Sequence, residues 1–261
     1  MVLAELLELA PSGVEEVDHG DTIEYAVYGA PGELPALPDL RVAAGAAFVD
    51  ITTTEVADDW ASRWRSFHRP VTIGGRLHVR PPWEQPVAVP DLSEIVIDPG
   101  QAFGTGAHPT TRLCLEALLD LDRAGKPQGP FVDLGCGAGV LAIAAAKLGW
   151  GPVLGLDHER ESVQATLDNA AVNGVELDAR RFDLLHDGSP PAAPTVAANL
   201  LRPLLLHVAR VGFAGTGPST LVVSGLLEHE TDEVATAFGA LGLRERARRA
   251  DGGWAALTLV R

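Results

Sequence analysis

Glycine and polar residues gather in two stretches that could bind a small molecule. The first is "DPGQAFGTGAHPTT" (residues 98–111), and the second is "VDLGCGAG" (132–139). Glycine lets the backbone approach a ligand closely, and backbone amides at a helix start suit a phosphate or a carboxylate. We therefore consider the two stretches together, and ask first whether either holds a phosphate.

The second stretch lies in "VDLGCGAGVLAIAAAKLG", which has the pattern of a strand, a glycine turn and a helix. This context makes the turn a candidate nucleotide site. Dinucleotide sites use G-x-G-x-x-G, whereas Gly135, Gly137 and Gly139 are spaced G-x-G-x-G and Val140 occupies the third dinucleotide position. Asp133 stands just before the turn and would sit badly beside a pyrophosphate. The pattern favours a ligand without phosphates.

A second acidic residue, Asp157, ends the next expected strand, "VLGLD". An acid at this place can accept hydrogen bonds from both hydroxyls of a ribose. S-adenosylmethionine fits the set, because helix-start amides suit its carboxylate, Asp133 suits its ammonium or an ordered water, and Asp157 suits its ribose. Asp183, after the following strand, is a weaker candidate for the adenine amine. The alternative interpretation is a tight turn followed by ordinary strand-end acids.

Strands and helices alternate regularly from residue 93 onward, and these elements must position the candidate residues. Strands are expected in "EIVIDPG", "FVDLG", "VLGLD", "LDARRFD", "TVAANL" and "STLVVSG". Helices are expected in "TTRLCLEALLDLDRAG", which has a threonine start, and in "GVLAIAAAKLG", "ESVQATLDNAAVNG", "RPLLLHVARVG" and "HETDEVATAFGALG". Such alternation predicts a mostly parallel, doubly wound sheet with helices on both faces. The closing "LRERARRADGGWAALTLV" predicts two antiparallel strands at its edge.

The first 92 residues have a different pattern. Residues 1–54 are expected to form a small α+β domain with a helix at 3–10, two short strands around a polar turn at His19–Asp21, and a strand at 46–56. Residues 55–92 are expected to form a linker with a helix, on which Trp60, Trp64 and Phe67 make one docking face, and a hairpin around Gly74–Gly75. Residues 93–261 would form the third and catalytic region.

Composition limits the possible partners. The 261 residues carry a formal net charge of −15 with a pI of about 4.8, which disfavours nucleic acid and favours a basic partner, unless the charge only maintains solubility. The two cysteines, Cys114 and Cys136, predict neither a disulfide nor a metal site, and we expect both to be reduced and partly buried. Neither a basic leader nor a run of about 18 apolar residues is present. We therefore expect a cytoplasmic protein without a membrane segment or a metal.

At this point a family resemblance is clear. Residues 93–261 resemble a class I, seven-stranded S-adenosylmethionine-dependent methyltransferase. The stretch "DPGQAFGTGAHPTTRLCLEAL" is similar to the PrmA family, which methylates lysines and the N-terminal amine of the ribosomal stalk-base protein L-eleven. The similarity extends from about Asp58 to near the C-terminus and includes "DDWASRW", "PPWE", "DNAAVNG" and "AANLL".

The resemblance implies roles for individual residues. Thr111, Asp157 and Asn199 would contact the cofactor together with Gly135 and Gly137, although Thr111 could instead act only as a helix cap. Phe103 would pack near the adenosine or the target amine. His108 would shape the loop that precedes the helix.

Asn199 is expected at the rim of the sheet, where it would orient the attacking amine, and we assign no general base. The first domain would be a shortened ferredoxin-like domain that grips the substrate protein.

The leading prediction is a monomeric methyltransferase acting on amines of a basic ribosomal protein, with S-adenosylhomocysteine as the product. The nearest alternative is a methyltransferase of the same fold that acts on another protein or a small molecule. A nicotinamide-dependent dehydrogenase is a different class, against which Val140 and Asp133 argue. A non-catalytic cofactor-binding module is a third class, which would not require Asn199.

Overall fold

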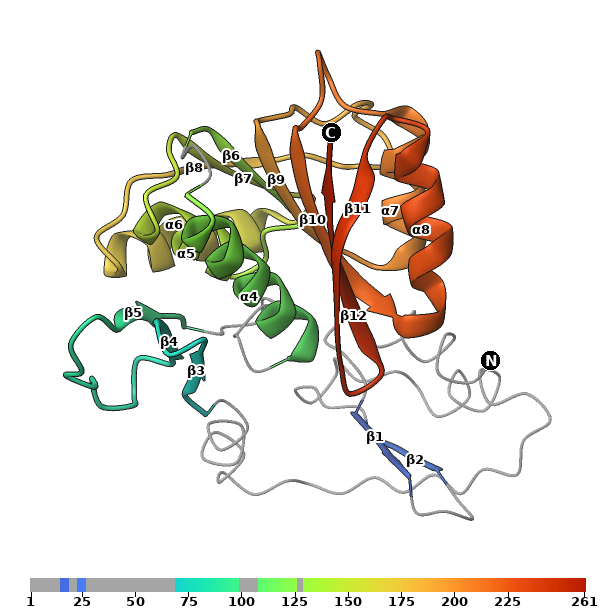
Figure 1. Cartoon of the computed structure of the whole chain (residues 1–261). Coiled ribbons are helices and arrows are strands. Elements are labelled where there is room, and N and C mark those ends of the chain that lie inside the picture. Colours follow the sequence, from blue (N-terminus) through green and yellow to red (C-terminus); the bar gives the residue numbers. More distant parts are fainter. Residues whose placement is uncertain (1–14, 19–22, 27–68, 99–107, 126–128) are drawn as a thin grey trace. The chain divides into compact units, whose positions relative to one another are not determined.

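The computed structural model describes residues 15–18, 23–26, 69–98, 108–125 and 129–261 (Figure 1). The chain divides into two units, Met1–Trp60 and Ala61–Arg261. In the first unit β1 (Glu15–Asp18) and β2 (Ile23–Ala26) pair in antiparallel register, which confirms the two strands expected around His19–Asp21. The helix expected at 3–10, the strand expected at 46–56 and the helix carrying Trp60, Trp64 and Phe67 lie outside the described residues.

The second unit is built on a mostly parallel sheet, as the alternating pattern predicts, and this sheet has the seven strands that the family resemblance implies. Its order is β11-β12-β10-β9-β6-β7-β8. The parallel strands are β6 (Phe131–Leu134), β7 (Val153–Asp157), β8 (Asp178–Arg181), β9 (Thr195–Asn199) and β10 (Thr220–Leu227). The closing hairpin lies at one edge, and β12 (Trp254–Val260) is inserted antiparallel between β10 and β11 (Arg244–Asp251).

Helices cover both faces of this sheet (Figure 1). One face carries α4 (Pro109–Arg123), α5 (Val140–Lys147) and α6 (Arg160–Val172), and the other carries α7 (Arg202–Val211) and α8 (Thr231–Gly239), which follows the short η1 (Glu228–Glu230). Alternate residues of each buried strand serve alternate faces. Phe131 belongs to the apolar core under α4 and α5, and Val132 belongs to the core under α7 and α8. The sheet is therefore buried on both sides.

A second, three-stranded sheet comprises β3 (Val71–Ile73), β4 (Leu77–Arg80) and β5 (Ser93–Val96). The antiparallel β3–β4 pair confirms the hairpin expected around Gly74–Gly75. β5 is a strand as expected, but it pairs in parallel with β4 and not with the seven-stranded sheet. Ile95 and Ile97 belong to the apolar core that also holds Leu118 of α4, so this small sheet packs on the helices of the large one.

The helix expected to begin at a threonine begins instead at Pro109, with His108 as its N-cap. The Nδ1 atom of His108 accepts a hydrogen bond from the backbone N–H of Thr110 at 3.3 Å and lies 2.8 Å from the Thr110 hydroxyl. The His108 ring also meets the edge of Trp254, with ring centroids 5.0 Å apart. Proline at the first helical position suits such a start, because it has no N–H to satisfy. His108 therefore caps α4, and the loop that it was expected to shape lies outside the described residues.

Candidate active site

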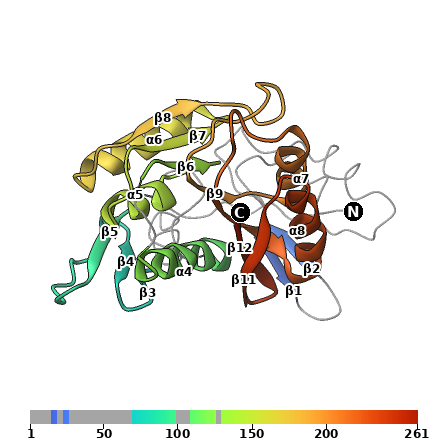
Figure 2. The same ribbon diagram turned by 45° about the horizontal axis from the view of Figure 1, so that its top comes forward.

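Three neighbouring strands bring the predicted site residues to one edge of the sheet. β6 lies between β9 and β7, and Figure 2 shows these three strands side by side. Asn199 ends β9, Gly135 directly follows β6 and Asp157 ends β7. The order of connection reverses at β6, and ligands of doubly wound sheets bind at the carboxyl ends of the strands at such a point. The predicted residues therefore converge on the place where this fold binds ligands.

The glycines of "LGCGAG" are required by the conformation of the loop. Gly135, Gly137 and Gly139 have φ angles of 73°, 53° and 85°, a region that side-chain-bearing residues rarely adopt. A β-carbon at Gly135 would also lie 2.4 Å from Cδ2 of Leu200. The loop is tied to β7, because the backbone N–H groups of Gly135 and Cys136 both donate to the Leu156 carbonyl, at 2.7 and 3.0 Å. This loop leads directly into α5.

Asp157 joins the glycine loop to the end of β7. One carboxylate oxygen accepts a hydrogen bond from the N–H of Gly137 at 2.9 Å, and the other accepts from the N–H of Glu159 at 3.1 Å. A carboxylate has about four acceptor positions, so two more donors can be accommodated. Asp157 can therefore hold the loop and still accept a pair of hydroxyl groups.

Asp133 lies inside β6 and is only 1% exposed. Its Oδ2 accepts a hydrogen bond from the N–H of Ala142 at 3.2 Å, whereas its Oδ1 has no hydrogen-bond partner among the described residues. Burial raises the pKa of Asp133 to about 7, aided by the charge of Asp157 and opposed by the Ala142 N–H. A buried acceptor without a donor is costly. The site therefore fits a ligand that brings an ammonium group or an ordered water.

Thr111 and Asn199, both predicted site residues, are in contact. Thr111 lies in the first turn of α4 and is completely buried. The side-chain nitrogen of Asn199 donates to the Thr111 hydroxyl oxygen at 3.4 Å. Within the described parts of the chain, no hydrogen bond reaches the side-chain oxygen of Asn199. This carbonyl can therefore accept a hydrogen bond from an amine.

The backbone that follows Asn199 is held by residues that the sequence analysis did not single out. The N–H of Leu200 donates to the carbonyl of Ser224 at 3.0 Å. Gly225 has φ +83°, and a β-carbon there would lie 2.3 Å from the Leu200 carbonyl oxygen. The register of β10 with β12 shifts between Val223 and Leu226, which marks a bulge around this glycine. A glycine inside the apolar run "LVVSGLL" was the available signal.

Asp183, a further predicted residue, has local hydrogen-bond partners. Asp183, just after β8, accepts hydrogen bonds from the Leu185 N–H at 2.9 Å and the His186 ring at 2.8 Å. The hydrogen bond from His186 lowers the pKa of Asp183 below its usual value. Asp183 thus organises a local turn, and its contact with an adenine stays a prediction. Phe103 lies outside the described residues.

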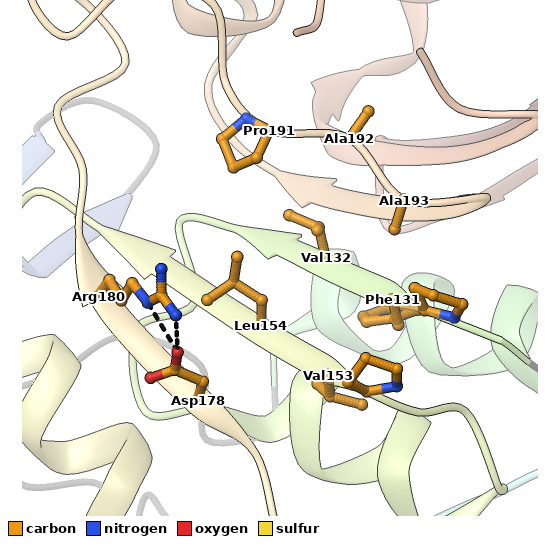
Figure 3. A pocket seen from close by; sticks show the side chains of 11 residues that line it. Phe131, Val132, Val153, Leu154, Asp178, Arg180, Pro191, Ala192 and Ala193 are labelled. Carbon is orange, nitrogen blue, oxygen red and sulfur yellow. Dashed lines mark hydrogen bonds and ion pairs between the residues drawn. The ribbon is translucent and has the colours of Figure 1, made fainter. Parts of the chain in front are cut away.

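A pocket of about 280 Å³ lies elsewhere (Figure 3). It is lined by the amino ends of β6, β7 and β8 and by the chain that leads into β9, including Pro191 and Ala193. Its polar wall is the Arg180–Asp178 ion pair. None of the predicted site residues that the structure describes lines this pocket, which lies at the opposite, amino ends of the same strands.

Other kinds of site find no support in the described parts of the chain. No cluster of three or more His, Cys, Asp or Glu side chains there could hold a metal ion. Cys114 and Cys136 are free and buried, as expected. No described helix is long and apolar enough to cross a membrane.

Comparison with known proteins gives consistent results. Residues 40–261 match the family model described as "Ribosomal protein L11 methyltransferase (PrmA)". A protein of Heliobacterium modesticaldum with the name ribosomal protein L11 methyltransferase is 37% identical over 207 residues, which cover 78% of this chain and 64% of that protein. A protein of the same name from Aeromonas hydrophila is 42% identical over 186 residues, covering 69% of this chain and 61% of that protein. The chain thus spans less than two thirds of the length of these relatives.

A solved structure has the same fold. The ribosomal protein L11 methylase of Lactobacillus delbrueckii subsp. bulgaricus superposes with a TM-score of 0.63 at 29% sequence identity. The superposition covers 74% of this chain and 99% of that chain. The seven-stranded, doubly wound arrangement is therefore the fold of that protein as well.

Proposed function

Because the chain belongs to the family of ribosomal protein L11 methyltransferases, we propose that it transfers methyl groups from S-adenosylmethionine to amines of a ribosomal protein. The acceptors would be lysine side chains, the N-terminal amine, or both. The observation that carries this proposal is the pairing of Asn199 with Thr111 at the ligand edge of the sheet. This pairing leaves the neutral side-chain carbonyl of Asn199 as an acceptor, close to the glycine loop that would bind the cofactor.

The cofactor would be held by groups of three elements. Asp157 would accept the ribose hydroxyls while it keeps Gly137 in place. Asp133 would receive the ammonium group at its unpartnered oxygen, and the Thr111 hydroxyl and the amides at the start of α5 would face the carboxylate. Asp183 is the candidate for the adenine amine. When bound, S-adenosylmethionine supplies an electrophilic methyl group on its positively charged sulfur.

Asn199 would prepare the amine for attack. A lysine amine must be neutral to react, although its ordinary pKa is about 10.4. Burial of the amine lowers this pKa, and the uncharged Asn199 carbonyl accepts a hydrogen bond without favouring the protonated ammonium as a carboxylate would. In-line displacement depends strongly on alignment, so positioning by Asn199 would contribute more than proton transfer. Phe103 would pack near the adenosine or the amine.

The substrate protein would be basic and would be gripped by residues 1–54, with residues 55–92 as the linker and 93–261 as the catalytic region. A chain with a net charge of −15 attracts basic partners and disfavours direct binding of nucleic acid. We propose a monomeric, cytoplasmic enzyme that releases S-adenosylhomocysteine.

Mass spectrometry tests this function. The ribosomal protein is incubated with the enzyme and S-adenosylmethionine, and mass increases of one or more methyl groups at lysines or the N-terminus are the expected result. The same incubation with Asn199→Ala enzyme is the matched control. If the enzyme bound the cofactor but left the ribosomal protein unmodified, the alternative would be favoured, in which a methyltransferase of this fold acts on another protein or a small molecule.

A further inference from the structure

The buried face of α6 is polar. Ser162, Thr166 and Asn169 are buried on this helix, and Ala170 is the only apolar residue of the helix that is equally buried. Buried polar side chains are costly unless they form hydrogen bonds. Most helices that cover a sheet bury an apolar stripe instead. The partners of these side chains therefore decide what the helix does.

Thr166 and Asn169 bond to the backbone of the glycine loop. The Thr166 hydroxyl, which is completely buried, donates to the Gly137 carbonyl at 2.9 Å. The side-chain nitrogen of Asn169, which is 3% exposed, donates to the Ala138 carbonyl at 2.9 Å. These two carbonyls belong to the turn whose conformation the glycines make possible. The side chains of α6 thus hold the glycine loop in place by donating hydrogen bonds to two of the loop's backbone carbonyl groups.

Asn169 also bonds to the chain that follows β5. Its side-chain oxygen accepts from the N–H of Asp98 at 2.9 Å, and its nitrogen donates to the Asp98 carbonyl at 3.2 Å. Asn173, which caps α6, makes the same pair of bonds to Val96, at 2.9 Å from its N–H and 2.6 Å to its carbonyl. Two side-chain amides thus take the place of a neighbouring strand along the edge of β5 that faces away from β4.

The spacing explains why the pair works. Residues four apart on a helix are separated by about 6 Å along its axis. Alternate residues of a strand are separated by about 6.6 Å. The N–H groups of Ser93 and Ile97 point to β4, where they donate to Arg76 and Arg80. The N–H groups of Val96 and Asp98 point to the other edge, where the two asparagines of "DNAAVNG" accept from them.

We propose that the polar face of α6, through Thr166 and Asn169, is a positioning element for the cofactor. It couples the glycine loop to the strand that leads into "DPGQAFGTGAHPTT", and so holds the loop backbone in the conformation that the cofactor would meet. This inference rests on the proposed function. The Asn173 side chain bonds to the strand and to the Asn169 carbonyl, at 2.8 Å, and makes no bond to the loop. It therefore separates positioning of the cofactor from stability of the fold.

The test uses the full chain and S-adenosylhomocysteine as the probe. Calorimetric titration is carried out well below the unfolding temperature of each variant, and thermal unfolding is measured without the probe. Asn169→Ala should bind about tenfold more weakly, and Thr166→Val a few-fold more weakly, because each loses hydrogen bonds to the loop. In the methyltransferase assay both should raise KM for the cofactor and leave kcat at saturating cofactor nearly unchanged. Asn173→Ala should lower the unfolding temperature and retain the wild-type affinity.

Two results overturn the inference. One is wild-type affinity in folded Asn169→Ala or, if that variant does not fold, in Thr166→Val. The other is an equal loss of affinity in Asn173→Ala, which would mean that any loosening of α6 weakens binding. Absence of binding by the wild-type protein would contradict the proposed function instead, so the two failures are distinguishable.

Discussion

The side-chain nitrogen of Asn199, at the end of β9, donates a hydrogen bond to the hydroxyl of Thr111, in the first turn of α4, across 3.4 Å. The two residues are 88 positions apart in the sequence. In this arrangement the nitrogen end of the Asn199 amide faces Thr111, and the carbonyl oxygen is directed away from it. The orientation of the amide thus depends on how α4 packs on the sheet.

Asn199→Ala should lower kcat by about tenfold or more, equivalent to at least about 1.4 kcal/mol of transition-state stabilisation. Asn199→Asp should also be impaired, because an adjacent anion would raise the pKa of the amine. Single-turnover kinetics with saturating cofactor measures this step. Thr111→Val is a useful companion, because it keeps the shape and removes the hydroxyl that holds the amide. If both Asn199 variants lost only thermal stability and the folded fraction kept a normal rate, Asn199 would have no part in the methyl transfer.

Asp157→Ala should weaken binding of S-adenosylmethionine by about 1.5–3 kcal/mol, the range for a hydrogen bond to a charged group. Part of this loss would arise because the N–H of Gly137, which donates a hydrogen bond to Asp157 at 2.9 Å, would lose its acceptor. Asp157→Asn keeps one acceptor oxygen and should lose less. Calorimetric titration of the three proteins gives the comparison. An Asp157→Ala protein with wild-type affinity would remove Asp157 from the site.

Asp133 makes the stability of the protein without cofactor depend on pH. Its pKa is raised by burial from 3.8 to about 7. Between about pH 4 and pH 7 the folded protein retains a proton that the unfolded chain has released, so the free energy of unfolding falls as pH rises through this window. Asp133→Asn should lack this decrease and should unfold at a higher temperature than the wild type at pH 8.

Thermal unfolding of both proteins from pH 5 to pH 8.5 measures the difference, which should grow up to about pH 7 and then stay constant. The Asp133→Asn variant should also bind the cofactor more weakly, because it lacks the carboxylate that would bind the ammonium group of the cofactor. Parallel stability profiles in the two proteins would mean that Asp133 is ionised throughout.

A chain that begins at Asp58 should still bind S-adenosylhomocysteine, because every described residue of the candidate site lies at or after Asp98. It should methylate the ribosomal protein with a kcat/KM at least about tenfold lower, since remote binding contributes to the rate. Circular dichroism and the titration serve as controls for folding. Full activity on the ribosomal protein would show that residues 1–54 do not grip the substrate.

Local patterns predicted most of the core. The strands that end at Asp157 and Asn199 were predictable, because each is a short apolar run followed by a polar residue and a helix. The convergence of their ends was predictable too, because parallel strands present their carboxyl ends at one edge. The start of α4 was not, because histidine is not a usual cap, and only the contacts of His108 with Thr110 and Trp254 give it that place.

Features that depend on non-local partners were less predictable. β5 has an ordinary strand sequence, and nothing in it indicates that it pairs with β4 and leaves its other edge to Asn169 and Asn173. The polar side of α6 would by composition be expected to face solvent. It is buried because its partners are backbone groups, which have no signature in the sequence.

The place of β12 in the sheet has a consequence for biosynthesis. β12 is made after β10 and β11 and yet lies between them. The Ala255 carbonyl of β12 accepts a hydrogen bond from the Ser224 hydroxyl. The Ser224 carbonyl in turn accepts a hydrogen bond from the N–H of Leu200, which directly follows Asn199. A nascent chain that has not reached residue 254 therefore lacks the strand that joins β10 to β11. It also lacks the hydrogen bond from Ser224 to Ala255, which helps to position the backbone partner of Leu200. The order of translation is thus not the order of assembly. The sheet edge at Asn199, which would bind the amine, is completed only after all the residues assigned to the site have been synthesised.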